Sequence, residues 1–435
     1  MRICAAIGST EEMRKHTSAD MAEIRLDVFR EIPDGLDVPR LITFKGVPDY
    51  SLLPEGFDEM MDVGESAVPI TDATVVSSYH DMEHTPSADR IVEIMNGMRG
   101  DVSKGAFAVN GFADLASIYS ASKMLDKRHV LIGMNELGMI TRIRSDLLGN
   151  EFTFAHTGTP TAAGQLSIEE MRRLGDGCII TGIVGHPLTH SLSQRIHGLA
   201  FEKTGVNGIY LKFDVPSLDG IEDTVRDFNI RGLNVTIPYK TDIIRHMDEI
   251  DETARTIGAV NTVTNTDGYL TGTNTDITGI ESAFKRAGVR IDASKRILVM
   301  GSGGSAKTCT YYFRRNDADV YVTGRNVKTV TELCSRFDCH IAKDADPREY
   351  DVIVNCTPVG MYSDSPYPSD IEKITSNQTV FDLVYDPNTP LNRLAEEHGC
   401  KIVKGMDMLV GQGLRSFYAW TGKTPDFDAI EEAIG

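Results

Sequence analysis

Long apolar runs are missing from this sequence, and so are cysteines in the paired spacing of metal sites. No stretch approaches the roughly 18 apolar residues that a membrane-spanning helix needs. The seven cysteines are scattered, odd in number and never spaced as CxxC, which indicates reduced thiols and excludes a zinc knuckle. The first residues, MRICAAIG, read as a strand and not as a signal peptide. We therefore expect a cytoplasmic protein with no metal site and no membrane partner.

Positive charge is also in short supply. The chain has 44 Lys and Arg against 63 Asp and Glu, a formal net charge of −19. Such a charge opposes attraction to phosphates, and the chain lacks a basic DNA-reading segment, so we expect no nucleic-acid partner. Small anionic substrates stay compatible with this charge, because a few local Lys and Arg side chains outweigh the global field.

What is present is enough apolar sequence for two or three domains. The chain has 435 residues, of which 41% are hydrophobic and 25% charged. Eight short β-type runs recur in the first part, the weakest being EMMDVG at residues 59–64, and two segments between them, Ser87–Arg99 and Ala113–Asp126, read as helices. This alternation predicts an α/β fold that begins with a (β/α)8 TIM barrel, a compact one because such barrels typically take about 250 residues.

A second β/α series follows the polar, Gly-containing stretch MRRLGDG at residues 171–177. Within it, KRILVMGSGGSAKTCTYYFRR reads as strand, glycine turn and helix, and DVYVTGR reads as the next strand. This βαβ unit lies in the middle of the series. We therefore expect a dinucleotide-binding subdomain inserted between an N-terminal substrate subdomain and a C-terminal return helix.

The turn in this unit has the spacing Gly301-x-Gly303-x-x-Ala306, which is the dinucleotide pattern with Ala in the last place. Gly301 permits the tight turn, Gly303 lets the backbone approach a pyrophosphate, and Ala306 allows close packing of helix on strand. An ordinary turn between a strand and a helix is the alternative. The predicted cofactor-binding residues of the turn are Gly301, Ser302, Gly303, Gly304, Ser305 and Ala306.

The end of the next strand indicates which dinucleotide binds. An NAD enzyme usually places an acid there, whereas this sequence has VTGRN with Arg325, followed by Lys328. A guanidinium matches a 2′-phosphate by bidentate hydrogen bonding, so the sequence favours NADP over NAD. The alternative is a solvated surface arginine.

Ordered motifs in the second half resemble those of the shikimate dehydrogenase family. They are GIVGHPLTHSLSQRIH, LNVTIPYK, GAVNT, GTNTDITG, NCTPVGM, DLVYDP, GMDMLVGQG and AWTG. The resemblance implies a substrate subdomain and a Rossmann-like NADP-binding subdomain that together reduce 3-dehydroshikimate to shikimate.

The resemblance makes Lys240 and Asp276 the catalytic pair. A hydride delivered to a ketone leaves charge growing on oxygen, so an ammonium beside it donates the proton while a carboxylate orients the ammonium. Taken alone, the two residues would more often be a surface lysine and an N-cap. The substrate-contacting residues implied by the motifs are Ser191, Ser193, Thr236, Asn261 and Gln412.

Two further positions belong to the predicted cleft of the second half. Tyr385 and Thr357 are expected to line it, beside the substrate and the cofactor respectively, without a chemical role. The family commonly has Asn-Arg-Thr where this chain has Gly324-Arg325-Asn326, and its second basic residue is displaced to Lys328. We therefore expect weaker discrimination for the 2′-phosphate than is usual in the family.

Motifs in the first half resemble those of type I 3-dehydroquinate dehydratases, (β/α)8 enzymes that work through a lysine Schiff base. They are AEIRLD, SSYHD, VSKGAF, GMITR, GNEFTFA and TAAGQ. The resemblance makes Lys104 the Schiff-base lysine and His80 the general acid and base. A neutral amine that adds to the ketone gives an iminium, which makes the neighbouring C–H acidic, and a histidine suits the transfer of that proton. Both residues are expected to close a strand at the C-terminal face of the barrel.

The same resemblance implies substrate-contacting positions in the barrel. They are Glu23, Arg25, Lys45, Arg142, Thr161 and Gln165. The planar guanidinium of Arg142 suits the substrate carboxylate. The chain departs from the family at Lys45, where the family has Arg, and at Thr161, where it has Ser. The loop after Lys45 also lacks the glycine-glycine-glutamate whose acid supports the histidine, and Glu55 is the replacement that the loop offers.

The leading interpretation is a bifunctional enzyme. Residues 1–175 would dehydrate 3-dehydroquinate, and residues 176–435 would reduce the product with NADPH. The second half would divide into a substrate subdomain, 176–283 with 406–435, and an NADP-binding subdomain, 284–405.

Two alternatives stay open. One is a reductase with an inactive barrel, and the other is a ligand-sensing regulator built from inactive copies of both enzymes. The regulator is disfavoured because Lys104, His80, Lys240 and Asp276 are all retained. The expected partners are the small molecules 3-dehydroquinate, 3-dehydroshikimate and shikimate, while the oligomeric state stays open, a homodimer being one option.

Overall fold

The computed structural model describes residues 1–7, 9, 18–29, 32, 36–189, 191–360 and 365–434. Its chain forms two compact units. The first contains Met1–Thr181 with Asn207–Ile230, and the second contains Gly182–Val206 with Arg231–Gly435. The domain and subdomain limits expected from the sequence stay predictions.

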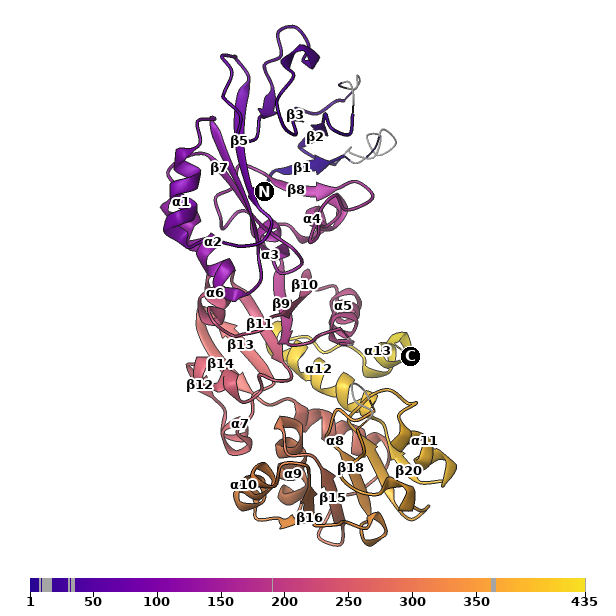
Figure 1. The fold of residues 1–435 in the computed structure, drawn as a ribbon. Coiled ribbons are helices and arrows are strands. Elements are labelled where there is room, and N and C mark those ends of the chain that lie inside the picture. The colour runs from indigo at the N-terminus through magenta and orange to yellow at the C-terminus, as the bar shows by residue number, and fades with distance from the viewer. Residues whose placement is uncertain are drawn as a thin grey trace. The chain divides into compact units, whose positions relative to one another are not determined.

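Eight parallel strands form the sheet of the first unit, in the order β7-β6-β5-β4-β3-β2-β1-β8 (Figure 1). The predicted barrel is thereby confirmed, including its weakest strand, β4. The strands are β1 (Ile3–Ala6), β2 (Met21–Arg25), β3 (Arg40–Thr43), β4 (Met60–Asp62), β5 (Thr74–Asp81), β6 (Val102–Ala108), β7 (His129–Met134) and β8 (Thr153–His156).

The ring is closed between β7 and β8 by a side chain. In the described chain no strand ladder joins these two strands. Instead the carboxamide of Asn150 accepts a hydrogen bond from Leu131 N at 2.7 Å and donates one to Leu131 O at 2.9 Å. Just below, Glu151 N donates to His129 O at 2.9 Å. A single asparagine thus satisfies the backbone groups that a neighbouring strand would otherwise pair.

Helices follow the later strands of the first unit. They are α1 (Ala88–Gly97), α2 (Phe112–Met124), α3 (Met139–Ile143) and α4 (Ile168–Leu174), with the short 3-10 helix η2 (Tyr50–Leu52). α4 begins with a capping box in which Ser167 and Glu170 bond to each other's backbone N–H. The unit also includes β10 (Gly208–Asp214) and α6 (Ile221–Asp227), which come from the second half of the sequence.

Strand β9 (Ile179–Gly185) is shared between the units, its first three residues counting with the first. It belongs to a sheet with the order β10-β9-β11-β13-β14-β12. The remaining elements of this part of the chain are α5 (Ser193–Thr204), β11 (Ile230–Val235), η3 (Asp242–His246), β12 (Glu249–Ile250), α7 (Glu252–Ile257), β13 (Thr262–Thr266), β14 (Tyr269–Thr273) and α8 (Asp276–Arg286).

The third sheet is parallel throughout and has the order β17-β16-β15-β18-β19-β20. In chain order this is 3-2-1-4-5-6, the dinucleotide-binding arrangement. Its elements are β15 (Arg296–Met300), α9 (Gly304–Arg315), β16 (Asp319–Thr323), α10 (Val327–Phe337), β17 (His340–Ile341), η4 (Pro347–Glu349), β18 (Val352–Asn355), η5 (Ile371–Lys373), β19 (Thr379–Asp382), α11 (Pro390–Glu397) and β20 (Lys401–Val403). The chain then returns through α12 (Gly405–Thr421), which packs on α8, and ends with α13 (Phe427–Ile434). The predicted Rossmann-like fold of this part of the chain is confirmed.

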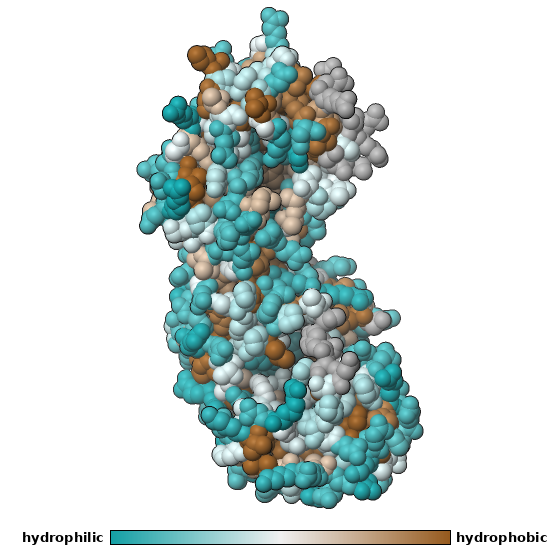
Figure 2. Space-filling model, in the orientation of Figure 1, coloured by the Kyte–Doolittle hydropathy of each residue, from teal (hydrophilic) through white to brown (hydrophobic). Residues whose placement is uncertain are grey.

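The surface is mixed. On the face drawn in Figure 2, hydrophobic residues are scattered among hydrophilic ones. In the part of the chain that the structure describes, no helix is long and apolar enough to cross a membrane.

Candidate active sites

Lys104 lies inside the barrel, where its ammonium is paired with a carboxylate. Its Nζ donates to Asp62 Oδ2 at 2.9 Å, and the two residues are only 5% and 1% exposed. Asp62 ends β4, and its other oxygen accepts from Ser78 Oγ at 2.7 Å and Gly64 N at 2.9 Å. The Phe154 ring lies 4.9 Å from Nζ. Asp62 is therefore held by three donors, with Lys104 as one of them.

The contact between Lys104 and Asp62 shifts the pKa of both groups. Burial lowers the pKa of Lys104, but the charges of Asp62 and Glu23 and the hydrogen bond to Asp62 outweigh it, so the pKa lies above its ordinary value. Burial raises the pKa of Asp62, but Lys104 and the hydrogen bond from Ser78 outweigh it, so that pKa lies below its ordinary value. In the resting protein the pair is an ion pair.

One positional expectation for Lys104 was wrong. Lys104 does not close its strand: it is the third residue of β6, opposite Ser78 of β5, and β6 continues to Ala108. The strand continues because β7 pairs with it as far as Met134. The four-carbon stem of the lysine instead carries Nζ to Asp62, which does end a strand.

His80 is the seventh of the eight residues of β5, near the end of the strand as expected. The residue is exposed to solvent, but partial burial of its ring, followed by the charges of Lys104 and Lys45, lowers the pKa of His80 to about 4. Among the described residues, His80 has no hydrogen bond or ion pair, and Glu55 is exposed without a bond to it. The imidazole is therefore neutral at pH 7 and able to accept a proton.

The remaining predicted contacts on β2 and β3 divide into buried and exposed groups. Glu23 is 8% exposed and accepts from Thr43 Oγ1 at 2.8 Å. Arg25 is engaged with Asp27, Nη2 to Oδ2 at 2.6 Å, and Lys45 is exposed. The charges of Glu23 and Lys45 act on Lys104 and His80, which places these side chains in one electrostatic cluster.

Arg142, in α3, has the environment expected of an anion clamp. It is 3% exposed, and Nη1 donates to Gly133 O at 2.8 Å, while Nε is buried without a partner. Burial lowers the pKa of Arg142 to about 10. The loop before α4 lies against it, because a Cβ on Gly164 would be 3.6 Å from Nη1. In that loop Gln165 Oε1 accepts from Thr161 N and Oγ1 at 2.9 and 3.0 Å.

The second unit contains a cavity of about 450 Å³, lined by residues of both its sheets, such as Asn234 of β11 at one side and Cys356 after β18 at the other. Every substrate-contacting residue expected there lines it, together with the expected catalytic pair. These residues are Ser191, Ser193, Thr236, Lys240, Asn261, Asp276, Tyr385 and Gln412, and the cofactor candidates Ser305 and Thr357 join them.

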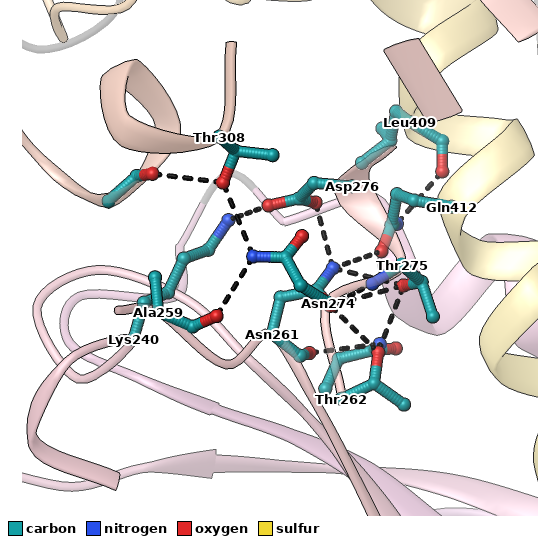
Figure 3. Close-up of polar contacts among 12 residues, drawn as sticks. Lys240, Ala259, Asn261, Thr262, Asn274, Thr275, Asp276, Thr308, Leu409 and Gln412 are labelled. Atoms are coloured by element: carbon teal, nitrogen blue, oxygen red, sulfur yellow. Dashed lines mark hydrogen bonds and ion pairs between the residues drawn. The ribbon is translucent and has the colours of Figure 1, made fainter. Parts of the chain in front are cut away.

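Lys240 and Asp276 are in direct contact in this cavity (Figure 3). Lys240 Nζ lies 2.5 Å from Asp276 Oδ2, and Asn261 Nδ2 donates to Oδ1 at 2.8 Å. Asn261 is fixed in turn, because its Oδ1 accepts from Thr275 N at 2.7 Å. Asp276 opens α8 and is 3% exposed, so it is not the surface N-cap of the alternative interpretation. The carboxylate therefore orients the ammonium within the cavity.

Sequence reasoning missed Asn274, which links the two parts of the second unit (Figure 3). Its Nδ2 donates to Ala259 O at 3.0 Å and to Thr308 Oγ1 at 3.2 Å. Thr308 in turn donates to Gly304 O in the first turn of α9 at 3.0 Å. The motif GTNTD contains Asn274, but nothing in its spacing reveals that Thr308 lies opposite.

The glycine turn has the geometry of a phosphate cradle. Gly301 has φ +121°, and a Cβ there would lie 3.1 Å from Cys356 O. Gly303 faces open space, and α9 begins after it without a side-chain cap, so its first N–H groups stay available to an anion. Ala306 is fully buried. Gly304 lies beside the catalytic lysine, because its missing Cβ would be 3.3 Å from the Cβ of Lys240.

Two exposed cations follow β16. Arg325 and Lys328 are exposed, and in the described chain neither has a hydrogen bond from its side chain or an ion pair. Asn326 between them caps α10, accepting from the N–H groups of Lys328 and Thr329. Ser302 in the glycine turn is within 2.7 Å of Thr329 through the two hydroxyls. The residues therefore fit a dinucleotide with an additional phosphate at the end of β16.

Three family models match this chain. The model for the shikimate dehydrogenase substrate binding domain matches residues 183–263, and that for the shikimate 5'-dehydrogenase C-terminal domain matches residues 405–434. The model for type I 3-dehydroquinase matches residues 59–175.

Relatives and solved structures match the second half. The NADP(+) shikimate dehydrogenases of Methanococcus maripaludis strain C7 and Shouchella clausii are 37% and 36% identical, over 59% and 58% of this chain and 95% and 96% of theirs. A crystal structure of shikimate dehydrogenase in complex with NADP+ matches with 33% identity and TM-score 0.57, over 60% of this chain and 96% of that one. The Thermus thermophilus enzyme in complex with NADP(H) and shikimate matches with 34% identity and TM-score 0.55, over 59% and 98%.

Proposed function

The chain belongs to the shikimate dehydrogenase family, and from this premise we propose which residues carry out its chemistry. It also carries a type I 3-dehydroquinase domain and is a bifunctional shikimate-pathway enzyme. It dehydrates 3-dehydroquinate to 3-dehydroshikimate and reduces that product to shikimate, with NADP as its cofactor. The observation that carries the assignment is the presence of two separate lysines, Lys104 and Lys240, each bonded to its own carboxylate.

In the dehydratase, Lys104 forms the Schiff base with the ketone of 3-dehydroquinate. Its ammonium must first lose a proton to solvent, and Asp62, the carboxylate already bonded to Nζ, positions the amine for attack on the ketone. His80 is neutral at pH 7 and takes the proton from the carbon next to the iminium, then returns it to the leaving hydroxyl. Arg142 holds the substrate carboxylate, which its buried and unpartnered Nε supports, because a guanidinium suits a carboxylate.

In the reductase, Lys240 donates a proton to the ketone oxygen of 3-dehydroshikimate. Asp276 and Asn261 hold the ammonium in its orientation, so the donor is in place before charge develops. Bound NADPH supplies the hydride. The residues that would hold it are Gly301–Ala306, Arg325, Lys328 and Thr357. Within this set, Gly304 lies next to Lys240, so the glycine turn is beside the proton donor.

The test is a coupled assay on the purified full chain. NADPH oxidation started by 3-dehydroquinate alone requires both halves, whereas 3-dehydroshikimate tests the reductase separately. We expect both substrates to oxidise NADPH, and borohydride with 3-dehydroquinate to label Lys104. Oxidation from 3-dehydroshikimate only, with no labelling, would refute the dehydratase assignment.

The proposal also covers the kind of substrate, the cellular location and the oligomeric state. The enzyme acts on small molecules, and we place it in the cytoplasm because its cysteines are free. A homodimer is the oligomeric state to test by light scattering.

A further inference from the structure

The segment Asn207–Ile230 belongs to the reductase by its sequence but to the barrel unit by its contacts. Asn207–Ile230 lies within the match to the shikimate dehydrogenase substrate binding domain, residues 183–263. In the structure the same segment is part of the compact unit that contains the barrel. The contacts that place it there are specific and buried.

Helix α2 of the barrel packs directly on this segment (Figure 1). Thr224 Oγ1 in α6 donates to Phe112 O at 2.9 Å, and Thr224 is fully buried. The ring of Phe112 lies 5.3 Å from that of Phe213, and the ring of Tyr119 lies 5.5 Å from that of Phe228. The outer face of a barrel helix, which normally meets solvent, is here an interior surface.

The closest approach is made by Gly220, which precedes α6. A Cβ there would lie 2.8 Å from the backbone N and Cα of Ala113, in the first turn of α2. A real side chain cannot occupy that space unless α6 moves away from α2.

A second contact reaches the dehydratase site. Arg144 is 5% exposed and donates to three carbonyls: Nη1 to Asp176 O at 2.6 Å, Nη2 to Cys178 O at 2.7 Å, and Nε to Phe228 O at 3.4 Å. It directly follows the five-residue helix α3, in which Arg142 lies two positions earlier. A helix this short has too few internal hydrogen bonds to fix its own orientation.

We propose that the segment Asn207–Ile230 of the reductase is a working part of the dehydratase, because it shares with Asp176 and Cys178 in anchoring Arg144 and thereby helps to position the substrate clamp Arg142. The inference rests on the proposed dehydratase function. Arg144 is a positioning residue, since it acts through α3 and touches no reacting atom. The carbonyl of Phe228 and the packing of α6 on α2 are the contributions of the reductase segment.

The test uses the full chain and two matched glycine variants. Gly220 and Gly205 both have left-handed backbones, with φ of +81° and +65°, but a Cβ on Gly205 meets nothing within 4 Å. Replacement of either glycine by Ala strains a left-handed backbone in the same way, so the difference in activity between the two variants reports the contact of residue 220 with α2.

We expect Gly220→Ala to raise the KM for 3-dehydroquinate about fivefold or more, since a clamp misplaced by a fraction of an ångström binds poorly. The kcat should stay within about twofold, and so should the kcat/KM of the reductase. Gly205→Ala should leave both activities within the same limit. Arg144→Lys, which keeps the charge but cannot reach three carbonyls, should raise the same KM, and combining it with Gly220→Ala should add less than the two effects separately.

Other outcomes separate the possibilities. An unchanged KM for 3-dehydroquinate in both Gly220→Ala and Arg144→Lys overturns the inference. A parallel fall of both activities, or a loss of dehydratase kcat alone, also overturns it, because either result indicates that the segment has a merely structural role. Failure of the unmodified chain to dehydrate 3-dehydroquinate would instead overturn the proposed function.

Discussion

Replacing Asp62 by Asn removes the carboxylate from the buried pair and leaves the Lys104 ammonium without its directly bonded counter-charge. Lys104 and Asp62 are 5% and 1% exposed, so the pair is shielded from solvent. Breaking such a pair typically costs about 3–5 kcal/mol, and we expect the free energy of opening of the barrel to fall by about that amount at neutral pH.

The deficit should depend on pH. The raised pKa of Lys104 contributes stability that is fully present below the unfolded-state pKa and is lost as pH rises through the folded-state value. In the variant, burial still lowers the pKa of Lys104, while the contributions of Asp62 that raise it are lost and that of Glu23 remains. The amine therefore sheds its proton at lower pH than in the native chain, which relieves the charge that Asp62 no longer pairs. The stability difference between the variant and the native chain should therefore shrink as the solution becomes alkaline.

Two assays measure these effects. Hydrogen exchange of the β4 and β6 peptides reports the opening free energy. Borohydride trapping with 3-dehydroquinate across a pH series reports the neutral amine, and its half-maximal pH should move downward in Asp62→Asn. Ser78→Ala is the control: it removes one hydrogen bond to Asp62, worth about 1 kcal/mol, but keeps the ion pair and so the trapping profile. If Asp62→Asn retains reductase activity and its trapping profile coincides with that of the native chain, the proposed role of Asp62 is wrong.

The other predictions concern single side chains. Arg325→Ala should raise the KM for NADPH about 10- to 100-fold, which is equivalent to the ~1.5–3 kcal/mol of a hydrogen bond to a charged group, and should have little effect on the KM for NADH. Arg290→Ala is the control at another exposed arginine. An equal effect of Arg325→Ala on both cofactors would refute the 2′-phosphate assignment. Lys240→Met should lower the reductase kcat about 10²- to 10⁴-fold in steady-state assays while dehydration continues at the native rate, and a residual rate near native would remove Lys240 from the mechanism. The pKa of His80, lowered to about 4 from 6.5, means that the unfolded chain takes up this proton first as pH falls. Stability should therefore decline between those values, less steeply in His80→Gln, and identical pH profiles of denaturant unfolding would contradict the depressed pKa.

The fold was largely predictable because each strand is indicated by the residues of its own short segment. Runs such as RICAAIG and HVLIGM combine β-branched residues with turn residues on either side, and both form strands close to the expected positions. The glycine turn was also local, since strand, turn and helix are consecutive. In each case the signal and the structure occupy the same short stretch of chain.

The parts of the sites that were missed depend on residues far apart in sequence. Asp62 is 42 positions from Lys104 and ends a strand of only three residues, so no spacing pointed to it. Asn274, which follows β14, bonds to Thr308 in α9, 34 positions away. Arg144 meets Phe228 across 84 positions, and GMITRIR gives no sign of this partner. Register and packing bring these groups together, and neither is written in the periodicity of a single segment.

The junction between β7 and β8 makes the barrel dependent on the chemistry of one amide. Asn150 both donates to and accepts from Leu131, so its deamidation to aspartate would turn the nitrogen that donates to Leu131 O into a second acceptor. Two oxygens would then face each other where a matched pair had been. Chemical ageing at this one position would weaken the ring at its joint, where the bond from Glu151 N to His129 O would remain, and would leave all seven of its ladders intact.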